Sequence, residues 1–209
     1  PATSYLAWET LYDKDNIEDL LTRDALKNAL LLGVSDLLNV LNTPAYLLGP
    51  AHYMNLAFIS VKLCLTHGLS LAASKALANH SLLLCGAFGR YKEGMAFADL
   101  ATSVNKRFGG RYYQVETNFT KLVAVQPWNF HLRNSLPALE QNFFQGMENG
   151  EVEYAFHSIL FYCIYQFLAG SPLAQVAKML NKYVQFVEDK KQDYHTTYLT
   201  IWRQLVSKL

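Results

Sequence analysis

Turn signals recur along the chain roughly every forty residues, and they bracket long apolar runs of helical character. One set consists of Gly68, Gly109-Gly110, Gly150 and the segment 189–191. A second set lies between them, at 86–89, 126–129 and 170–172. Such interleaved breaks are typical of stacked helical hairpins, in which each hairpin covers the apolar face of its neighbour. The sequence therefore predicts an all-α fold, an α-solenoid, and solenoids serve mostly as binding surfaces or spacers.

The apolar spacing indicates about nine helices. We expect an irregular lead-in over 1–22 and one helical-repeat domain over 23–209. Within that domain, antiparallel hairpins are predicted at 24–67, 70–108, 111–148 and 151–188, followed by a final helix over 194–209. That final helix is predicted to have no hairpin partner. A solenoid normally ends in a polar cap, so an unpaired end indicates a segment of a longer protein.

Glycine and proline residues mark the predicted helix boundaries. Gly68 is expected to stop a helix and Pro172 to begin one, while Pro44 and Gly49-Pro50 are expected to break the chain between the two helices of the first hairpin. Pro137 is expected in the first turns of its helix. Small side chains should let the two helices of the second hairpin approach closely, and these are Ala96, Ala98 and Ala101.

The composition excludes several classes of protein. Hydrophobic residues make up 51% of the chain and charged residues 17%, which excludes intrinsic disorder. The net charge is +1, and the basic residues of the middle third are scattered without interleaved aromatic residues, which argues against nucleic-acid binding. Three widely spaced cysteines, Cys64, Cys85 and Cys163, indicate buried thiols in a reducing compartment. We therefore expect a cytoplasmic protein.

One stretch requires a test for a membrane span. The segment 154–177 contains no Asp, Glu, Lys or Arg, but the break at 170–172 interrupts it after about sixteen residues, and a span needs about twenty. The sequence therefore favours a buried helix and no membrane span. The first twelve residues show no signal peptide either.

No motif of known chemistry is present. The chain lacks a phosphate-binding loop, the catalytic loops of kinases and the Gly-x-Ser-x-Gly turn. Its six histidines include no His-Glu-x-x-His motif and no pair at ligand spacing, so we expect neither a metal nor a cofactor. The sequence therefore predicts a protein without catalytic activity.

Two features resemble known families. The turn Gly89-x-Tyr91-x-x-Gly94, with alanines downstream, resembles the tetratricopeptide hairpin turn, although glycine stands at position 94 where alanine is usual. The order of several longer signatures resembles the helical region of very large multidomain signalling kinases. These signatures are Asn42-Thr43-Pro44-Ala45-Tyr46, His67-Gly68, 81–86, 131–137, 150–155, 161–165 and 170–173. Members of that family join a serine/threonine-kinase-like domain, an AAA/STAND-type ATPase, this helical array, a GAF sensor and often a histidine kinase.

The resemblance covers about residues 17–209. It implies a right-handed tetratricopeptide-like superhelix that acts as a non-catalytic scaffold or regulatory segment and contacts neighbouring domains or a signalling protein. The low charge and the irregular first twenty residues depart from the family pattern and leave the N-terminal boundary open.

In tetratricopeptide-like arrays the first helix of each hairpin lines the concave side, so polar residues there are candidate contacts. These residues are Lys75, Asn79, Gln114, Asn118, Lys121 and His157. Asn118 and Lys121 lie three positions apart and therefore share a helix face. A plain solvated stripe would look the same. An alternative function is a sensor that holds a small-molecule or peptide effector in this groove with Asn118, Lys121 and His157.

Overall fold

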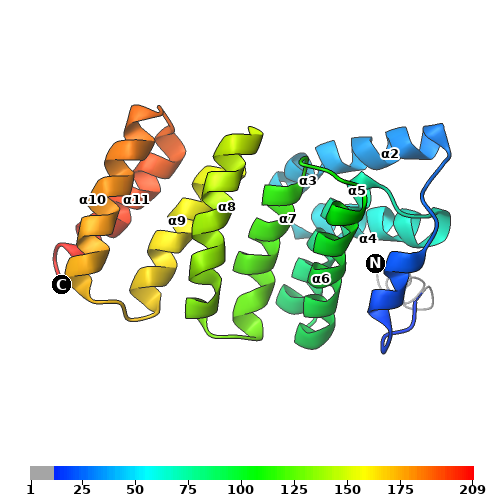
Figure 1. Cartoon of the computed structure of the whole chain (residues 1–209), viewed down its shortest axis with the longest axis horizontal. Coiled ribbons are helices and arrows are strands. Elements are labelled where there is room, and N and C mark those ends of the chain that lie inside the picture. The colour runs from blue at the N-terminus through cyan, green and yellow to red at the C-terminus, as the bar shows by residue number, and fades with distance from the viewer. Residues whose placement is uncertain (1–11) are drawn as a thin grey trace. The chain divides into compact units, whose positions relative to one another are not determined.

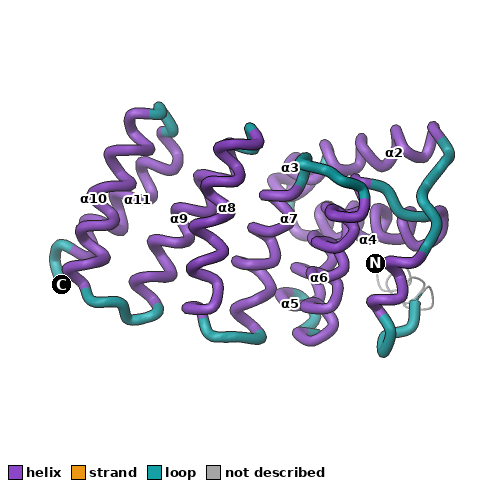
Figure 2. The backbone as a smooth tube through the Cα atoms, in the orientation of Figure 1, coloured by secondary structure: helices purple, strands orange, loops and turns teal. Residues whose placement is uncertain are grey.

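The computed structural model describes residues 12–209, and its regular structure is helical throughout (Figures 1 and 2). The all-α prediction is therefore confirmed for this part of the chain. The backbone contacts divide the chain into two compact units, the first ending at Asn129 and the second spanning Phe130–Leu209. The first eleven residues of the expected irregular lead-in lie outside the described residues.

The described part of the first unit contains a 3-10 helix, six α-helices and, at its end, a π-helical turn followed by a 3-10 turn. Its elements are η2 (Ile17–Thr22), α2 (Ala29–Val40), α3 (Asn42–Leu48), α4 (Pro50–His67), α5 (Leu71–Gly86), α6 (Tyr91–Arg107), α7 (Gln114–Thr120), the π-helical turn η3 (Lys121–Val125) and the 3-10 turn η4 (Gln126–Trp128).

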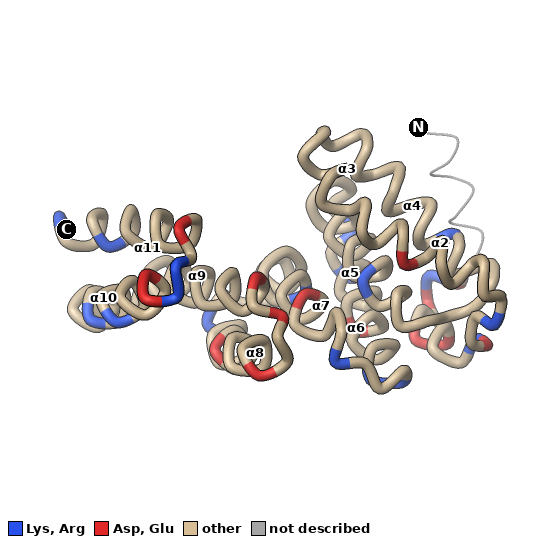
Figure 3. Tube along the Cα trace, turned by 90° about the horizontal axis from the view of Figure 1, so that it is seen from above, with Lys and Arg blue, Asp and Glu red and all other residues tan. Residues whose placement is uncertain are grey.

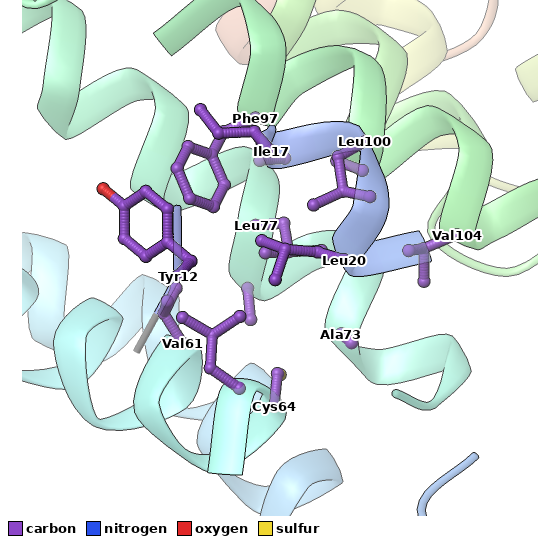
Figure 4. Close-up of a cluster of buried hydrophobic side chains, with 14 of the residues drawn as sticks. Tyr12, Ile17, Leu20, Val61, Cys64, Ala73, Leu77, Phe97, Leu100 and Val104 are labelled. Carbon is purple, nitrogen blue, oxygen red and sulfur yellow. The ribbon is translucent and has the colours of Figure 1, made fainter. Parts of the chain in front are cut away.

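The hairpin of α5 and α6 forms the centre of this unit and agrees with the hairpin predicted over 70–108. Ala98 and Ala101 are fully buried, and a methyl group added at Gly94 would lie 2.4 Å from the Cys85 sulfur. The small side chains thus allow the close helix approach that the sequence predicts. Side chains from η2, α4, α5 and α6 fill the core around this hairpin (Figure 4).

A short backbone pairing joins the start of the chain to the turn between α4 and α5. Ala25 and Leu69 form an isolated parallel β-bridge, in which the Leu26 amide donates to the Leu69 carbonyl at 2.7 Å. Gly68 makes this approach possible, because its φ is +111° and an added Cβ would lie 2.6 Å from the Asp24 carbonyl oxygen. The predicted helix stop at Gly68 is confirmed, and the close packing explains why only glycine fits.

A surface arginine holds η2 against α6. One guanidinium nitrogen of Arg107 donates to the carbonyls of Leu21 and Arg23 at 2.6 and 2.7 Å. Ile17 and Leu20 point from η2 into the core of the unit (Figure 4). The N-terminal segment is therefore fastened both by buried apolar side chains and by this single guanidinium group.

The first hairpin contains a short helix that the sequence did not predict, α3, between the two expected helices. Helix α2 ends at Val40, four residues before Pro44, because a proline ring clashes with the carbonyl four positions earlier. Pro44 itself lies in the first turn of α3, where its missing N–H removes no hydrogen bond. The second expected break is present at Gly49, whose φ is +122°, and Pro50 begins α4.

The end of the first unit is one continuous helical segment of changing geometry. The α-helix α7 passes into the π-turn η3 and then into the 3-10 turn η4. Pro127 explains the change, because its ring lacks an N–H and clashes with the carbonyl four residues earlier. The helix therefore widens before the proline and tightens across it.

The second unit begins with the 3-10 turn η5 and continues with four α-helices. Their bounds are η5 (Leu132–Ser135), α8 (Leu136–Asn149), α9 (Val152–Leu168), α10 (Leu173–Asp189) and α11 (Asp193–Val206). Pro137 lies in the first turn of α8 and Pro172 immediately precedes α10, as the sequence predicts. The second unit's core contains aromatic pairs around Phe143, which contacts Phe156, Tyr183 and Phe186.

The packing of these helices differs from the predicted pairing. The strongest contacts join α8 to α9 and α10 to α11, and α9 also touches α10 and α11. The final helix was expected to have no partner, but it packs against α10 and α9 through Leu199 and Val206. The unit boundary at Asn129 and Phe130 falls between the two helices that were expected to form the hairpin over 111–148. Helix positions follow from local signals, whereas partner choice depends on the faces that the folded chain brings together.

Candidate functional site

The structure distributes the six predicted contact residues over both units. Five of them, Lys75, Asn79, Gln114, Asn118 and Lys121, lie in the first unit on α5, α7 and η3. The sixth, His157, lies on α9 in the second unit. Their common groove therefore stays a prediction.

Lys75 forms an ion pair inside the first unit. Its ammonium nitrogen lies 2.8 Å from a carboxylate oxygen of Glu116, and both side chains are only 11% exposed. The same ammonium group lies 5.7 Å from the ring centroid of Tyr113, which precedes α7 in a left-handed conformation with φ of 62°. The ion pair and the contact of the ammonium group with the Tyr113 ring both join α5 to α7. Lys75 is thus a structural link in this unit.

Asn79 lies one turn further along α5 and is also buried. Its amide nitrogen has no hydrogen-bond partner among residues 12–209. Gln114 and Asn118 are half-buried on α7. Burial thus separates Lys75 and Asn79 from the more accessible Gln114 and Asn118, although all four were predicted as one polar stripe.

Lys121 begins the π-turn η3, and its ammonium group forms an ion pair with Asp99 of α6 at 2.6 Å. The carboxylate side is well exposed, with 55% of the Asp99 side chain accessible. Exposed pairs of this kind contribute at most about 1 kcal/mol to stability. Lys121 could therefore exchange this partner for a ligand at little cost.

His157 belongs to a histidine pair in the second unit. Its Nδ1 lies 3.1 Å from Nε2 of His195 on α11 and 2.8 Å from the Glu153 carbonyl oxygen. Burial, with a further contribution from His157, lowers the pKa of His195 to about 4. The tautomer that fits has a proton on His157 Nδ1, which faces both acceptors, so His195 is neutral at physiological pH.

The exposed face of α11 carries a stripe of large apolar side chains. Its members are Tyr194, Tyr198, Ile201 and Leu205, each 44–55% exposed. The spacing of four, three and four residues places them on one side of the helix. We call this surface the α11 stripe.

Helices α2 and α3 and the residue between them also expose large apolar side chains. These are each at least 41% exposed: Leu30, Leu37, Val40, Leu41, Tyr46, Leu47 and Leu48. Single exposed apolar residues are normal, but this many within nineteen residues is unusual for a surface in contact with solvent alone. Both units therefore present apolar surface that their own helices leave uncovered.

A groove lies between α8, α9 and α10 in the second unit and has a volume of about 510 Å³. Glu140 lines it from α8, and Tyr162 and Gln166 line it from α9. The remaining lining residues come from the connection to α10 and from α10 itself: Ser171, Gln175, Val176, Lys178, Met179, Lys182 and Tyr183. We call this the α8–α10 groove.

Side-chain contacts fix much of the groove wall. The Ser171 hydroxyl donates to the Gln166 amide oxygen at 2.6 Å, and the rings of Tyr162 and Tyr183 meet edge to face at 6.4 Å. Burial, with the charge of Glu140 as the next cause, raises the pKa of Tyr183 to about 12. The Tyr183 hydroxyl therefore stays protonated at physiological pH.

None of the groove residues was among the predicted contacts. One available signal was the pair Lys178 and Lys182, four apart on α10 with no acidic residue three or four positions from either. The groove itself depends on the packing of three helices, which the sequence pattern does not specify.

The described residues show neither a metal site nor a reactive thiol. Between residues 12 and 209, no group of three or more His, Cys, Asp or Glu side chains could hold a metal ion. Cys64, Cys85 and Cys163 are buried free thiols whose pKa values are raised by burial. No helix in the described part of the chain is long and apolar enough to cross a membrane. No protein-family model, curated protein or solved structure matches the chain.

Proposed function

We propose that this chain is a non-catalytic scaffold that binds protein segments through its exposed helix faces. In this proposal the hairpins stack as a tetratricopeptide-like solenoid with a right-handed superhelical path. The chain acts in the cytoplasm as a regulatory segment of a multidomain signalling kinase. It transmits signals by holding a neighbouring domain or partner protein in one of that protein's states.

The α11 stripe is the observation that carries the proposal. The inner face of α11 already packs on the second unit through Leu199 and Val206, while Tyr198 and Ile201 stay exposed on another side. A helix with two apolar faces is typical of positions between two packing partners. The exposed side therefore suits an amphipathic helix or hairpin supplied by another protein segment.

The chemistry of the stripe favours a protein over a charged ligand. Two tyrosines, Tyr194 and Tyr198, are in ring contact at 4.7 Å, and they offer apolar area together with hydroxyl groups. Tyrosine is enriched at the centres of protein interfaces, where it loses little conformational entropy on binding. Ile201 and Leu205 extend the same surface toward the end of α11.

The proposal can be tested by site-specific photo-crosslinking in the intact protein in its own cells. A photoreactive amino acid at Ile201 should crosslink to one defined segment, either of the same polypeptide or of a signalling protein. The matched control is Gln204, which is exposed on the same helix but outside the stripe. Equal crosslinking from positions 201 and 204 would contradict the proposed interface.

The larger assignment has its own test. An antibody against this chain should detect a native polypeptide several times larger than 23.7 kDa in cell extract. A band near that mass would overturn the assignment to a multidomain kinase, and the scaffold function would then belong to a free-standing adaptor.

A further inference from the structure

We propose that the α8–α10 groove binds a small organic acid, with the carboxylate at Lys178 and Lys182 and the apolar body against Met179 and Tyr162. This site goes beyond the scaffold function, because it uses residues on α8, α9 and the groove side of α10. It also differs from the predicted effector groove, since none of Asn118, Lys121 and His157 lines it.

The size and lining of the groove suit a small ligand. Its volume of about 510 Å³ lies within the range of roughly 300–1,000 Å³ that is common for small-molecule sites. Val176 and Met179 form an apolar floor together with the faces of the two tyrosine rings. A mostly apolar concavity with a few polar groups at its edge is the usual composition of a ligand pocket.

The charges around the groove favour an anion. Lys178 and Lys182 lie one turn apart on α10, so their ammonium groups repel each other (Figure 3 shows the lysines of α10 in blue). Lys178 has no acidic residue three or four positions away on the helix, and neither has Lys182. A carboxylate between them would relieve this repulsion and accept hydrogen bonds from both.

Glu140, the one acidic residue in the lining, comes from α8, whereas the two lysines come from α10. Burial, together with the charge of Glu140, raises the pKa of Tyr183 to about 12, so that hydroxyl stays protonated. The Lys182 ammonium group lies 4.9 Å from the Tyr183 ring centroid. The groove therefore offers two lysines on one helix to a ligand, and its single carboxylate lies on another helix.

The far end of the groove is held in a fixed arrangement before any ligand enters. Gln166 accepts a hydrogen bond from Ser171, and the Tyr162 ring packs edge to face on Tyr183. These contacts order the Tyr162 ring against which the apolar body would lie. Groups that are ordered beforehand lose little entropy on binding, which favours a specific ligand over loose adsorption.

The test uses three probes that share one body and differ in charge: 4-phenylbutyrate, 4-phenylbutyramide and 4-phenylbutylamine. Each is titrated into the isotope-labelled full chain, and binding is followed by the NMR shifts of amides on α9 and α10. We expect the acid to bind at least about fivefold more tightly than the amide, and the amine to bind most weakly. The preference for the acid should shrink at high salt, because screening weakens exposed charges.

Two double variants test whether the preference for the acid over the amide comes from the lysines of the groove. Lys178→Met/Lys182→Met should bring the acid and the amide within about twofold of each other, because methionine keeps the helix and the apolar surface. Lys190→Met/Lys208→Met removes the same net charge outside the groove and should keep the preference.

The proposal is overturned if none of the probes binds, if the acid has no advantage over the amide, or if the shifts lie away from α9 and α10. An equal loss of preference in both double variants would also overturn it, since bulk charge would then explain the effect.

Discussion

Helices α5 and α10 use their polar residues in opposite ways. Thirteen of the sixteen residues of α5 are buried, including Lys75, Asn79 and His80, because neighbouring helices surround it. Only five of the seventeen residues of α10 are buried, and its lysines face solvent or the groove. A polar residue on a predicted helix therefore indicates a solvent-exposed position only where neighbouring helices leave one side of that helix uncovered.

The largest difference should appear between two lysines. Lys75→Met should lower the free energy of unfolding by about 3–5 kcal/mol, because Glu116 would be left buried without its partner. Lys178→Met should change it by less than about 0.5 kcal/mol, because that side chain is exposed. Urea denaturation followed by circular dichroism measures both. The double variant Lys75→Met/Glu116→Leu should recover most of the lost unfolding free energy. Equal effects of Lys75→Met and Lys178→Met would contradict the difference between the two helices.

Buried apolar residues should contribute equally to stability on α5 and α10, unlike the lysines of these two helices. Leu77 on α5 and Leu180 on α10 are 0% and 1% exposed, so Leu77→Ala and Leu180→Ala should each lower the unfolding free energy by about 3 kcal/mol. The same denaturation experiment applies, with exposed Asn181→Ala as the neutral control. A loss below about 1 kcal/mol for Leu180→Ala would show that the core of the second unit is loosely packed.

Substitutions at two glycines should distinguish the cost of an unfavourable backbone conformation from the cost of a steric clash. Gly68→Ala should lower the unfolding free energy by about 2–3 kcal/mol, because it combines a φ of +111° with a collision against the Asp24 carbonyl. Gly170→Ala should lower it by about 1 kcal/mol, because φ is +75° but no atom lies within 4 Å of the added carbon. Thermal unfolding of both variants checks the order, and the reverse order would contradict the role of the Ala25–Leu69 bridge.

A further expected effect concerns pH. The pKa of His195 is about 4 in the folded protein and about 6.5 when unfolded, so the unfolded state takes up the proton first as the pH falls. Its contribution to stability is therefore complete above pH 6.5 and is lost between about pH 6.5 and 4. From pH 7 to 5 this residue should account for a loss of about 2 kcal/mol.

Denaturation of His195→Phe at the two pH values measures this contribution. The variant should lose less stability on acidification than the wild type, whereas exposed His52→Gln should behave like the wild type. His80 acts in the same direction, because burial lowers its pKa to about 3, so some pH dependence should remain in every variant. An unchanged pH dependence in His195→Phe would contradict the assignment.

Local signals predicted much of the fold. The hairpin of α5 and α6, the stop at Gly68 and the helix start after Pro172 depend on residues close in sequence, and all three are confirmed. The segment around Pro44 shows the limit of this approach, because the breaks expected there and at Gly49 are present but the short helix α3 between them was not predicted. The pairing of α8 with α9 could not be predicted, since it depends on which apolar faces meet in three dimensions.

The sites were less predictable than the helices. Lys75 was predicted as a contact residue because it is polar and lies on the first helix of its hairpin. Only the packing of α7 against α5 shows that the Lys75 ammonium group is buried in an ion pair with Glu116. The groove needs Glu140, Tyr162 and Lys182, which come from three helices and share no sequence motif. The α11 stripe could be predicted in part, because its four residues recur at helical spacing. What the sequence pattern lacks is which of the two faces of that helix remains open.

The contact of Arg107 with the backbone of the N-terminal segment also sets an order of opening. One guanidinium group bonds to two carbonyls there, Arg23 donates to the Leu65 carbonyl, and the rest of η2 is held by a few apolar side chains. Such a short segment is expected to separate from the α5–α6 hairpin before the hairpin itself unfolds. Amide hydrogens of 17–22 should therefore exchange with solvent sooner than those of α5, and a protease that reaches this unit should cut there first. The segment η2 would then open while the hairpin beneath it stays folded.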